Sequence, residues 1–307
     1  MEIRNGVWPT MITFFTRDNK IDYDATERLI EWYLNKNVDG IFALCQSSEM
    51  FYLSDSEKLE LIRFILDKVN GRVPVIASGH TDFEIENQKE LLCEIAKSGV
   101  DALVLITNIL AGREPSAERF KENVKWYLEI LPKEIPLGMY ECPYPFKYVL
   151  PTEILRWCAD TGRFQFLKDT CCDIKRIEER LKVLKATEMK LYNANTATLL
   201  ESLRMGAAGY SGVMANIHPE LYHWLYENID CTALDKTETV AGFLSVASLC
   251  ESLDYPQCAK YYLHRELGGG EATRRPFERE FNDTDRTQME HIRFLTGKFN
   301  DMLRVGM

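Results

Sequence analysis

Short apolar runs alternate with longer amphipathic stretches along most of the chain. Eight runs have the character of strands that are buried on both faces, namely residues 6–15, 41–44, 73–77, 102–106, 135–140, 164–167, 189–192 and 210–214. Stretches of helical periodicity follow them, namely residues 22–37, 54–66, 82–97, 114–131, 151–160, 173–186, 196–205 and one that ends near residue 227. Eight strand–helix units without a break in composition predict an α/β fold, with a parallel sheet closed into a (β/α)8 TIM barrel.

The chain after residue 230 has a different pattern. Only helical periodicity is present there, at residues 240–249, 259–267 and 288–303. We therefore expect two parts, a barrel formed by residues 1–230 and a C-terminal helical extension, residues 231–307, packed on the barrel. An interface with another subunit is the alternative role for these helices.

Composition narrows the class of protein. The 307 residues are 46% hydrophobic and 27% charged, which is ordinary for a globular protein. A net charge of −10 without a long basic cluster argues against nucleic-acid and anionic-membrane partners. We find no apolar signal core at the start and no run that approaches 18 apolar residues. Nine cysteines without C-x-x-C spacing indicate a reduced, cytoplasmic protein. The five histidines include no i, i+4 pair, so no metal site is expected.

Polar residues follow several of the predicted strands. The catalytic groups of a (β/α)8 barrel lie at the carboxyl ends of its strands. The groups at these ends are Gln46-Ser47-Ser48, Thr107-Asn108, Tyr140-Glu141, Lys168, Asn193-Ala194-Asn195 and Ser211. We expect them to share one mouth of the barrel.

Lys168 ends an apolar strand, where an unpaired charge is costly. Burial lowers the pKa of a lysine, and the neutral amine is the form that attacks a ketone to make a Schiff base. Tyr140, at the end of the preceding strand, suits proton transfer in imine chemistry. The alternatives are a lysine that reaches water where its strand ends and an aromatic residue that only packs at the barrel rim.

The turn Gln46-Ser47-Ser48 offers hydroxyls and successive backbone N–H groups. Such a turn can hold a carboxylate without a cation. A plain helix N-cap is the alternative.

These motifs together resemble the dihydrodipicolinate synthase and N-acetylneuraminate lyase superfamily of class I, pyruvate-type aldolases. The resemblance covers almost the whole chain. Its motifs are Gly6-Val7-x-Pro9, Ile21-Asp22, Val38-Asp39-Gly40-Ile41, Cys45-Gln46-Ser47-Ser48-Glu49 as a degenerate G-[ST]-T-G-E loop, Leu53-Ser54 with Glu57, residues 73–77, Gly99-Val100-Asp101-Ala102, Met139-Tyr140-x-x-Pro143, Leu167-Lys168-Asp169 and Gly206-x-x-Gly209-x-x-Gly212 with Ala215-Asn216. Tyr140 lies 28 residues before Lys168, which fits the family's Tyr–Lys pair.

The resemblance implies a role for each site residue. Lys168 would form the imine and Tyr140 would transfer protons. Ser47, with its neighbours Gln46 and Ser48, would hold the carboxylate of a 2-oxo acid. Ser211 would line the pocket through its backbone, and Ala194 would contact substrate. The resemblance also implies no cofactor beyond the lysine imine, and a homodimer or homotetramer.

Several positions depart from the family pattern. Cys45 and Ser48 replace the two glycines of the loop, and Gln46 replaces its first hydroxyl residue. Ile109-Leu110 stands where the synthases carry an aromatic pair that includes the relay tyrosine. Pro145 stands where the synthases carry an arginine for the carboxylate of the second substrate. We therefore expect an aldehyde less anionic than aspartate semialdehyde, with repulsion from Glu141 if that side chain faces the pocket.

Three functions remain open at this point. The first is an aldolase or lyase that joins or cleaves a 2-oxo acid of the pyruvate type and an aldehyde. The second is a synthase or dehydratase that uses the same imine and ends differently. The third is a catalytically retired paralogue that binds a ligand or partner without turnover, as the altered loop and the missing relay tyrosine suggest.

Overall fold

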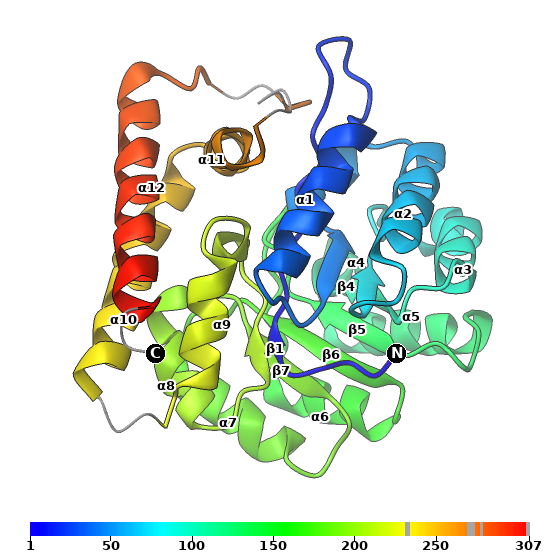
Figure 1. Ribbon diagram of the computed structural model, residues 1–307. Helices are drawn as coiled ribbons and strands as arrows, with labels where there is room; N and C mark the ends of the chain where they lie inside the picture. The colour runs from blue at the N-terminus through cyan, green and yellow to red at the C-terminus, as the bar shows by residue number, and fades with distance from the viewer. Residues whose placement is uncertain (231–233, 269–273, 277–278, 305–307) are drawn as a thin grey trace.

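The computed structural model describes residues 1–230, 234–268, 274–276 and 279–304. Its centre is an eight-stranded parallel sheet in the order β1-β8-β7-β6-β5-β4-β3-β2. The strands are β1 (Gly6–Val7), β2 (Ile41–Leu44), β3 (Val75–Ala77), β4 (Ala102–Ile106), β5 (Leu137–Tyr140), β6 (Phe164–Asp169), β7 (Lys190–Asn193) and β8 (Gly209–Tyr210). Figure 1 shows them surrounded by helices.

The sheet closes on itself through the segment that follows β1. Thr10 forms an isolated parallel bridge with Phe42 of β2. The Met11 amide donates to the Phe42 carbonyl (2.9 Å), and the Phe42 amide donates to the Pro9 carbonyl (3.0 Å). The predicted (β/α)8 barrel is therefore confirmed.

Two of the expected strands are reduced to two residues each in the structure. The run 6–15 contributes the strand β1 and two isolated bridges, from Thr10 to Phe42 and from Phe15 to Ile21, because Pro9 has no N–H to donate to a ladder. The run 210–214 continues β8 only through Tyr210, and residues Val213–Asn216 form the 3-10 helix η5. Both runs remain buried, which is why they have the hydrophobic pattern of strands.

Eight helices alternate with the strands as predicted, namely α1 (Tyr23–Asn35), α2 (Asp55–Val69), α3 (Lys89–Lys97), α5 (Ala117–Ile130), α6 (Thr152–Asp160), α7 (Ile174–Leu184), α8 (Leu199–Arg204) and α9 (Pro219–Glu227). A further short helix, α4 (Thr107–Ala111), begins directly after β4 and is buried throughout. Ser54 and Glu57 form a reciprocal capping box at the start of α2.

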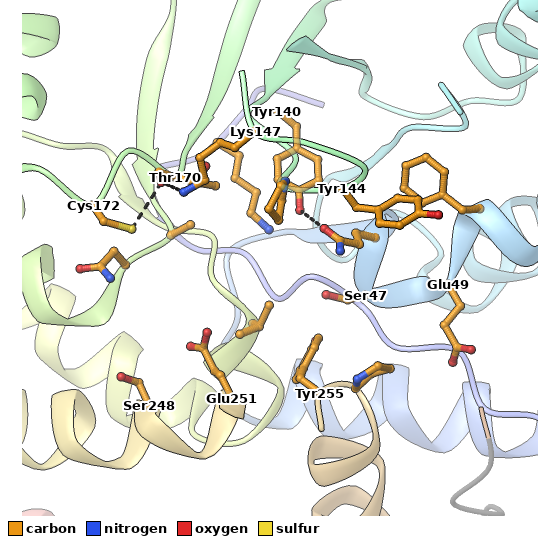
Figure 2. A pocket seen from close by; sticks show the side chains of 18 of the residues that line it. Ser47, Glu49, Tyr140, Tyr144, Lys147, Thr170, Cys172, Ser248, Glu251 and Tyr255 are labelled. Atoms are coloured by element: carbon orange, nitrogen blue, oxygen red, sulfur yellow. Dashed lines mark hydrogen bonds between the residues drawn. The ribbon is translucent and has the colours of Figure 1, made fainter. Parts of the chain in front are cut away.

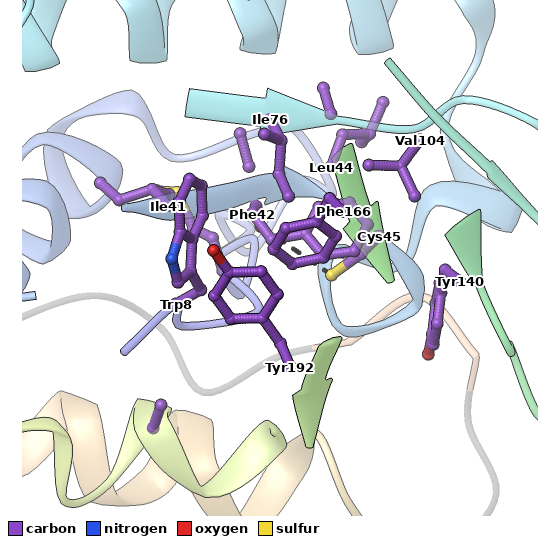
Figure 3. Close-up of a cluster of buried hydrophobic side chains, with 14 of the residues drawn as sticks. Trp8, Ile41, Phe42, Leu44, Cys45, Ile76, Val104, Tyr140, Phe166 and Tyr192 are labelled. Atoms are coloured by element: carbon purple, nitrogen blue, oxygen red, sulfur yellow. Dashed lines mark hydrogen bonds between the residues drawn. The ribbon is translucent and has the colours of Figure 1, made fainter. Parts of the chain in front are cut away.

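Aromatic side chains fill the interior of the barrel below its mouth. The Phe166 ring stacks on the Tyr192 ring with centroids 4.3 Å apart, and the edge of Trp8 meets Phe166 at 5.4 Å. The centroid of the Phe42 ring lies 6.2 Å from that of Phe166 and 5.9 Å from that of Tyr140. Figure 3 shows Phe42, Phe166, Tyr192 and Trp8 gathered in the barrel. The barrel is thus a packed core that supports its mouth from below.

The C-terminal extension consists of α10 (Leu234–Ala247), the 3-10 helix η6 (Ser248–Ser252), α11 (Gln257–Leu267) and α12 (Asp283–Arg304). Helix α10 packs against α9, and α11 packs against α1 and α12. A buried ion pair joins Lys260 of α11 to Glu49 after β2, and Arg275 binds both carboxylate oxygens of Glu57. The division into domains at residue 230 stays a prediction. None of the described helices is long and apolar enough to cross a membrane.

Candidate active site

A cavity of about 430 Å3 lies at the carboxyl ends of the strands, between the barrel mouth and the extension. Figure 2 shows the side chains that point into it. Its lining residues within the described part of the chain come from the β2 turn (Gln46, Ser47, Glu49, Phe51, Tyr52), from β5, β6 and the loops after them (Tyr140, Pro143, Tyr144, Lys147, Lys168, Thr170, Cys172), from the barrel beyond β7 (Ala194, Asn195, Thr196, Val213) and from the C-terminal part (Ser248, Glu251, Tyr255, Pro256, Pro276).

Lys168 lies on the cavity wall at the centre of the strand register. It pairs with Tyr140 of β5 on one side and Tyr192 of β7 on the other. The residue is 2% exposed, and its Nζ lies 4.4 Å from the centroid of the Tyr140 ring. Within the described residues, Lys168 has no hydrogen-bond or ion-pair partner. Burial lowers the pKa of this amine, which favours the neutral, nucleophilic form.

Tyr140 lies beside Lys168 because adjacent strands end at the same level. Its phenol donates a hydrogen bond to Oε1 of Gln46 (3.4 Å), as does the Cys142 thiol (3.4 Å). Burial raises the pKa of Tyr140 far above 10. The phenol therefore remains protonated at neutral pH and acts as a donor.

The β2 turn forms the 3-10 helix η1 (Gln46–Ser48), and two of its side chains have different roles. The Ser47 hydroxyl lines the cavity and donates to Thr10 Oγ1 (3.0 Å). The Ser48 hydroxyl instead binds the carbonyls of Met11 (2.7 Å) and Ala43 (3.0 Å), and Ser48 is absent from the described cavity wall. Ser48 thus stabilises the turn in place of the family's glycine.

Of the two other predicted substrate-binding residues, one lines the cavity and one does not. Ala194 lines the cavity. Ser211 is fully buried outside the described cavity wall, although its amide donates to the Asn193 carbonyl (2.9 Å) across the strands. The structure therefore brings together Lys168, Tyr140, Ser47, Gln46 and Ala194 at one site, and it places Ser48 and Ser211 behind the wall.

Glu141 does not face the cavity, so the repulsion considered from the sequence is absent. Its carboxylate is fully buried and binds the guanidinium of Arg180 on α7 (2.6 Å). It also accepts from the backbone amides of Leu150 (2.8 Å) and Thr170 (3.0 Å). The same guanidinium binds Asp169. One arginine thereby holds the residue after Tyr140 and the residue after Lys168.

Sequence reasoning missed Lys147 on the loop after β5. This lysine lines the cavity two residues beyond Pro145, and its Nζ donates to the Thr170 carbonyl (2.6 Å). This loop therefore brings a cation to the cavity close to the position of Pro145. Arg113, which follows α4, lies over the Phe83 ring at 4.7 Å and outside the described cavity wall.

The extension contributes the remaining residues that the sequence did not indicate. Ser248 and Glu251 of η6 and Tyr255 of the following turn all line the cavity. The Tyr255 phenol accepts a hydrogen bond from the Asn216 side chain (3.1 Å). Burial raises the pKa of Tyr255 far above 10, and the Ser47 hydroxyl opposes this increase. A helical pattern after the last barrel unit gave no sign that its residues reach the mouth.

Comparison with known proteins places this geometry in a family. The protein-family model described as "Dihydrodipicolinate synthetase family" matches residues 4–279. A 4-hydroxy-tetrahydrodipicolinate synthase of Clostridium tetani is 29% identical over 232 residues, which are 74% of this chain and 75% of that protein. The synthase of Psychrobacter arcticus is 27% identical over 263 residues, 85% of each chain.

Solved structures share the fold. A dihydrodipicolinate synthase from Thermotoga maritima superposes with a TM-score of 0.86 at 19% identity, covering 96% of this chain and 99% of that one. A prophage protein of the same family from E. coli K12, solved in complex with pyruvate, has a TM-score of 0.85 at 19% identity and covers 95% of this chain and 98% of its own. The chain therefore belongs to the dihydrodipicolinate synthetase family.

Proposed function

We propose that this protein is a pyruvate-type class I aldolase or lyase that cleaves a 2-oxo acid, or condenses one with an aldehyde, through a Schiff base on Lys168. The observation that carries the proposal is a buried lysine amine that opens onto the cavity beside a tyrosine ring, without a hydrogen-bond or ion-pair partner among the described residues. The covalent imine serves as the electron sink, so the proposal includes no further cofactor.

Each residue of the barrel wall has a part in this chemistry. Neutral Lys168 attacks the ketone carbon, and the Tyr140 phenol passes a proton from the water of the cavity to the oxygen that leaves as water, so that Tyr140 is protonated again after the step. The Ser47 hydroxyl and the neighbouring amides of the β2 turn hold the substrate carboxylate. The family name and the pyruvate complex of the E. coli prophage protein support a pyruvate-type substrate.

The retired-paralogue alternative loses part of its motivation. It was based on the altered β2 turn and on the missing relay tyrosine. Ser48 makes hydrogen bonds that hold the turn, and Ser47 still lines the cavity, whereas Ile109-Leu110 occupies the relay position as expected. A synthase or dehydratase that uses the same imine remains the second candidate, because all the features that favour an aldolase favour it too.

For the second substrate we propose an aldehyde that is uncharged at its far end. Pro145 replaces the arginine of the synthases, and the ammonium of Lys147 has one donor engaged by the Thr170 carbonyl. A lysine also lacks the bidentate fork with which arginine binds a carboxylate. Condensation of pyruvate with aspartate semialdehyde should therefore be slower than with the best uncharged aldehyde of a panel, in both the wild type and Lys147→Met. A wild-type preference for aspartate semialdehyde that Lys147→Met abolishes would show that Lys147 replaces the arginine.

Borohydride trapping tests the imine directly. The protein is incubated with pyruvate, reduced with borohydride, digested and analysed by mass spectrometry. We expect the mass increase on the peptide that carries Lys168. A protein that gains no mass, or gains it on another lysine, contradicts the proposal.

Two further parts of the proposal concern the whole molecule. We propose a homodimer or homotetramer located in the cytoplasm. Light scattering coupled to gel filtration measures the oligomeric mass, and a monomer at micromolar concentration would contradict the first part.

A further inference from the structure

The extension brings a carboxylate to the cavity that has no assigned role. Two carboxylate side chains line the cavity within the described part of the chain, Glu49 and Glu251. Both oxygens of Glu49 are engaged, one by Lys260 and the other by the Arg275 amide (2.8 Å). Glu251 has no hydrogen-bond or ion-pair partner among the described residues. Glu251 is therefore the carboxylate that is available to a ligand.

The position of Glu251 directs it toward the reacting atoms. Figure 2 shows its side chain pointing from η6 into the space that separates it from Tyr140 and Lys147. Its charge acts on the Lys168 amine, and the Lys168 charge acts on Glu251 in return. Lys168 and Glu251 thus line the same cavity, Lys168 from the barrel and Glu251 from the extension.

Imine chemistry needs a base that the barrel wall does not provide. Removal of a methyl proton from the pyruvate imine requires an acceptor that is deprotonated at neutral pH. The Tyr140 phenol is protonated there and donates to Gln46, whose amide oxygen does not take up a proton. Ile109-Leu110 replaces the relay tyrosine and is buried within α4.

We propose that Glu251 is the catalytic base that converts the pyruvate imine on Lys168 into its enamine. This rests on the proposed function. The Glu251 carboxylate takes a proton from the methyl carbon, and the electron pair of that C–H bond becomes the C=C bond. The π pair of the protonated C=N bond returns to the Lys168 nitrogen as its lone pair. Iminium and carboxylate become enamine and carboxylic acid, so no oxidant or reductant is needed.

The charges and titratable groups around Glu251 suit this role. The positive charge of Lys168 on β6 lowers the pKa of Glu251. The negative charge of Glu251 in turn raises the pKa of four groups that face it, namely Cys172 of the β6–α7 loop, Tyr210 of β8, Tyr222 of α9 and Cys258 of α11. Lys147 lines the same cavity. Glu251 retains contact with the water of the cavity, while the protein atoms around it raise the pKa of its carboxyl to about 7, and Lys168 opposes that increase. The carboxylate form therefore becomes predominant as the pH rises through about 7.

Exchange of the pyruvate methyl protons tests the proposal without an aldehyde. Pyruvate is incubated with the protein in D2O, and proton NMR follows the loss of its methyl signal, corrected for exchange without protein. Borohydride trapping of pyruvate is measured on the same samples. The variants are Glu251→Gln, which keeps the shape and removes the base, and Glu251→Asp, which retains a carboxylate. Glu238→Gln is the matched control, because Glu238 lies on α10 of the same extension and forms a surface ion pair with Arg204 of α8.

We expect Glu251→Gln to trap pyruvate as the wild type does and to lower the exchange rate by about 100-fold or more. The wild-type rate should rise with pH through about 7, Glu251→Gln should lack this rise, and Glu251→Asp should recover part of the rate. Equal exchange by wild type and Glu251→Gln, or trapping by the wild type without exchange, would overturn the role of Glu251. A wild type that does not trap pyruvate would overturn the proposed function itself.

Discussion

The two walls of the cavity differ in how they are built. On the barrel wall, Tyr140 and Lys168 are neighbours because β5 and β6 pair in one register, and Arg180 holds the residue that follows each of them. The opposite wall, with Glu251 and Tyr255, belongs to a segment that reaches the mouth through side-chain contacts with the barrel. The first wall is positioned by backbone pairing and a buried ion cluster. The second is positioned by contacts between distant side chains, including the Lys260–Glu49 ion pair and the hydrogen bond from Asn216 to Tyr255.

The difference has a chemical consequence. The barrel wall carries Lys168, Tyr140 and the β2 turn, which match the family motifs. The extension wall carries Glu251 and Tyr255, which belong to none of these motifs. Removing groups from each wall therefore tests which one controls imine formation and which one controls the later steps.

The largest expected effect concerns the barrel wall. Lys168→Ala should abolish borohydride-dependent labelling by pyruvate, because no other amine lies buried beside Tyr140 in the described cavity wall. Lys147→Met is the matched control, since Lys147 lines the same cavity and should leave the labelling intact. If Lys168→Ala were still labelled, another lysine would form the imine and the assignment to Lys168 would be wrong.

The second prediction concerns the support of that wall. Arg180→Met should lower the free energy of unfolding by about 3–5 kcal/mol, because it leaves the carboxylates of Glu141 and Asp169 buried without their cation. Lys182→Met on the same helix removes only an exposed pair with Glu178 and should cost no more than about 1 kcal/mol. Urea denaturation of both variants measures the difference, and equal stabilities would show that the ion cluster does not hold the wall.

The third prediction concerns Ser47 of the β2 turn. Ser47→Ala removes a hydrogen bond to a charged group, which costs about 1.5–3 kcal/mol, or roughly 10- to 150-fold in pyruvate affinity. The pyruvate concentration at half-maximal trapping measures this change. Ser252→Ala, outside the described cavity wall, serves as control. If Ser47→Ala bound pyruvate with unchanged affinity, Ser47 would have only a structural role, through its hydrogen bond to Thr10.

The smallest expected effect connects the two walls. Tyr255→Phe removes the hydroxyl that accepts from Asn216 and acts on Ser47, at a cost of about 1 kcal/mol, or roughly fivefold in pyruvate affinity. Because Ser47 and Tyr255 are coupled, the double variant Ser47→Ala/Tyr255→Phe should lose less than the sum of the two single losses. If the two losses in pyruvate affinity simply added, Tyr255 of the extension would not assist Ser47 of the β2 turn.

The barrel wall could be predicted largely from the sequence. Lys168 and Tyr140 each follow a short apolar strand, and the ends of adjacent parallel strands lie at the same edge of a sheet, so their proximity follows from the pattern. Ser48 and Glu141 show where this reasoning stops. Alternation identifies a residue near a strand end, but its side chain turns inward or outward according to local hydrogen bonds, such as those from Ser48 to Met11 and from Arg180 to Glu141.

What the sequence determined by itself was the order of the elements, the fold class and the proximity of Lys168 and Tyr140. These features depend on local periodicity and on backbone pairing between neighbouring strands, and both can be recognised from the pattern of hydrophobic and polar residues. The tertiary structure alone decided that Lys147, Glu251 and Tyr255 share a cavity with Lys168. The placement of Glu251 and Tyr255 depends on how α10 and α11 pack on α9 and α1, and that of Lys147 on the β5–α6 loop and its bond to Thr170; no local pattern encodes these contacts.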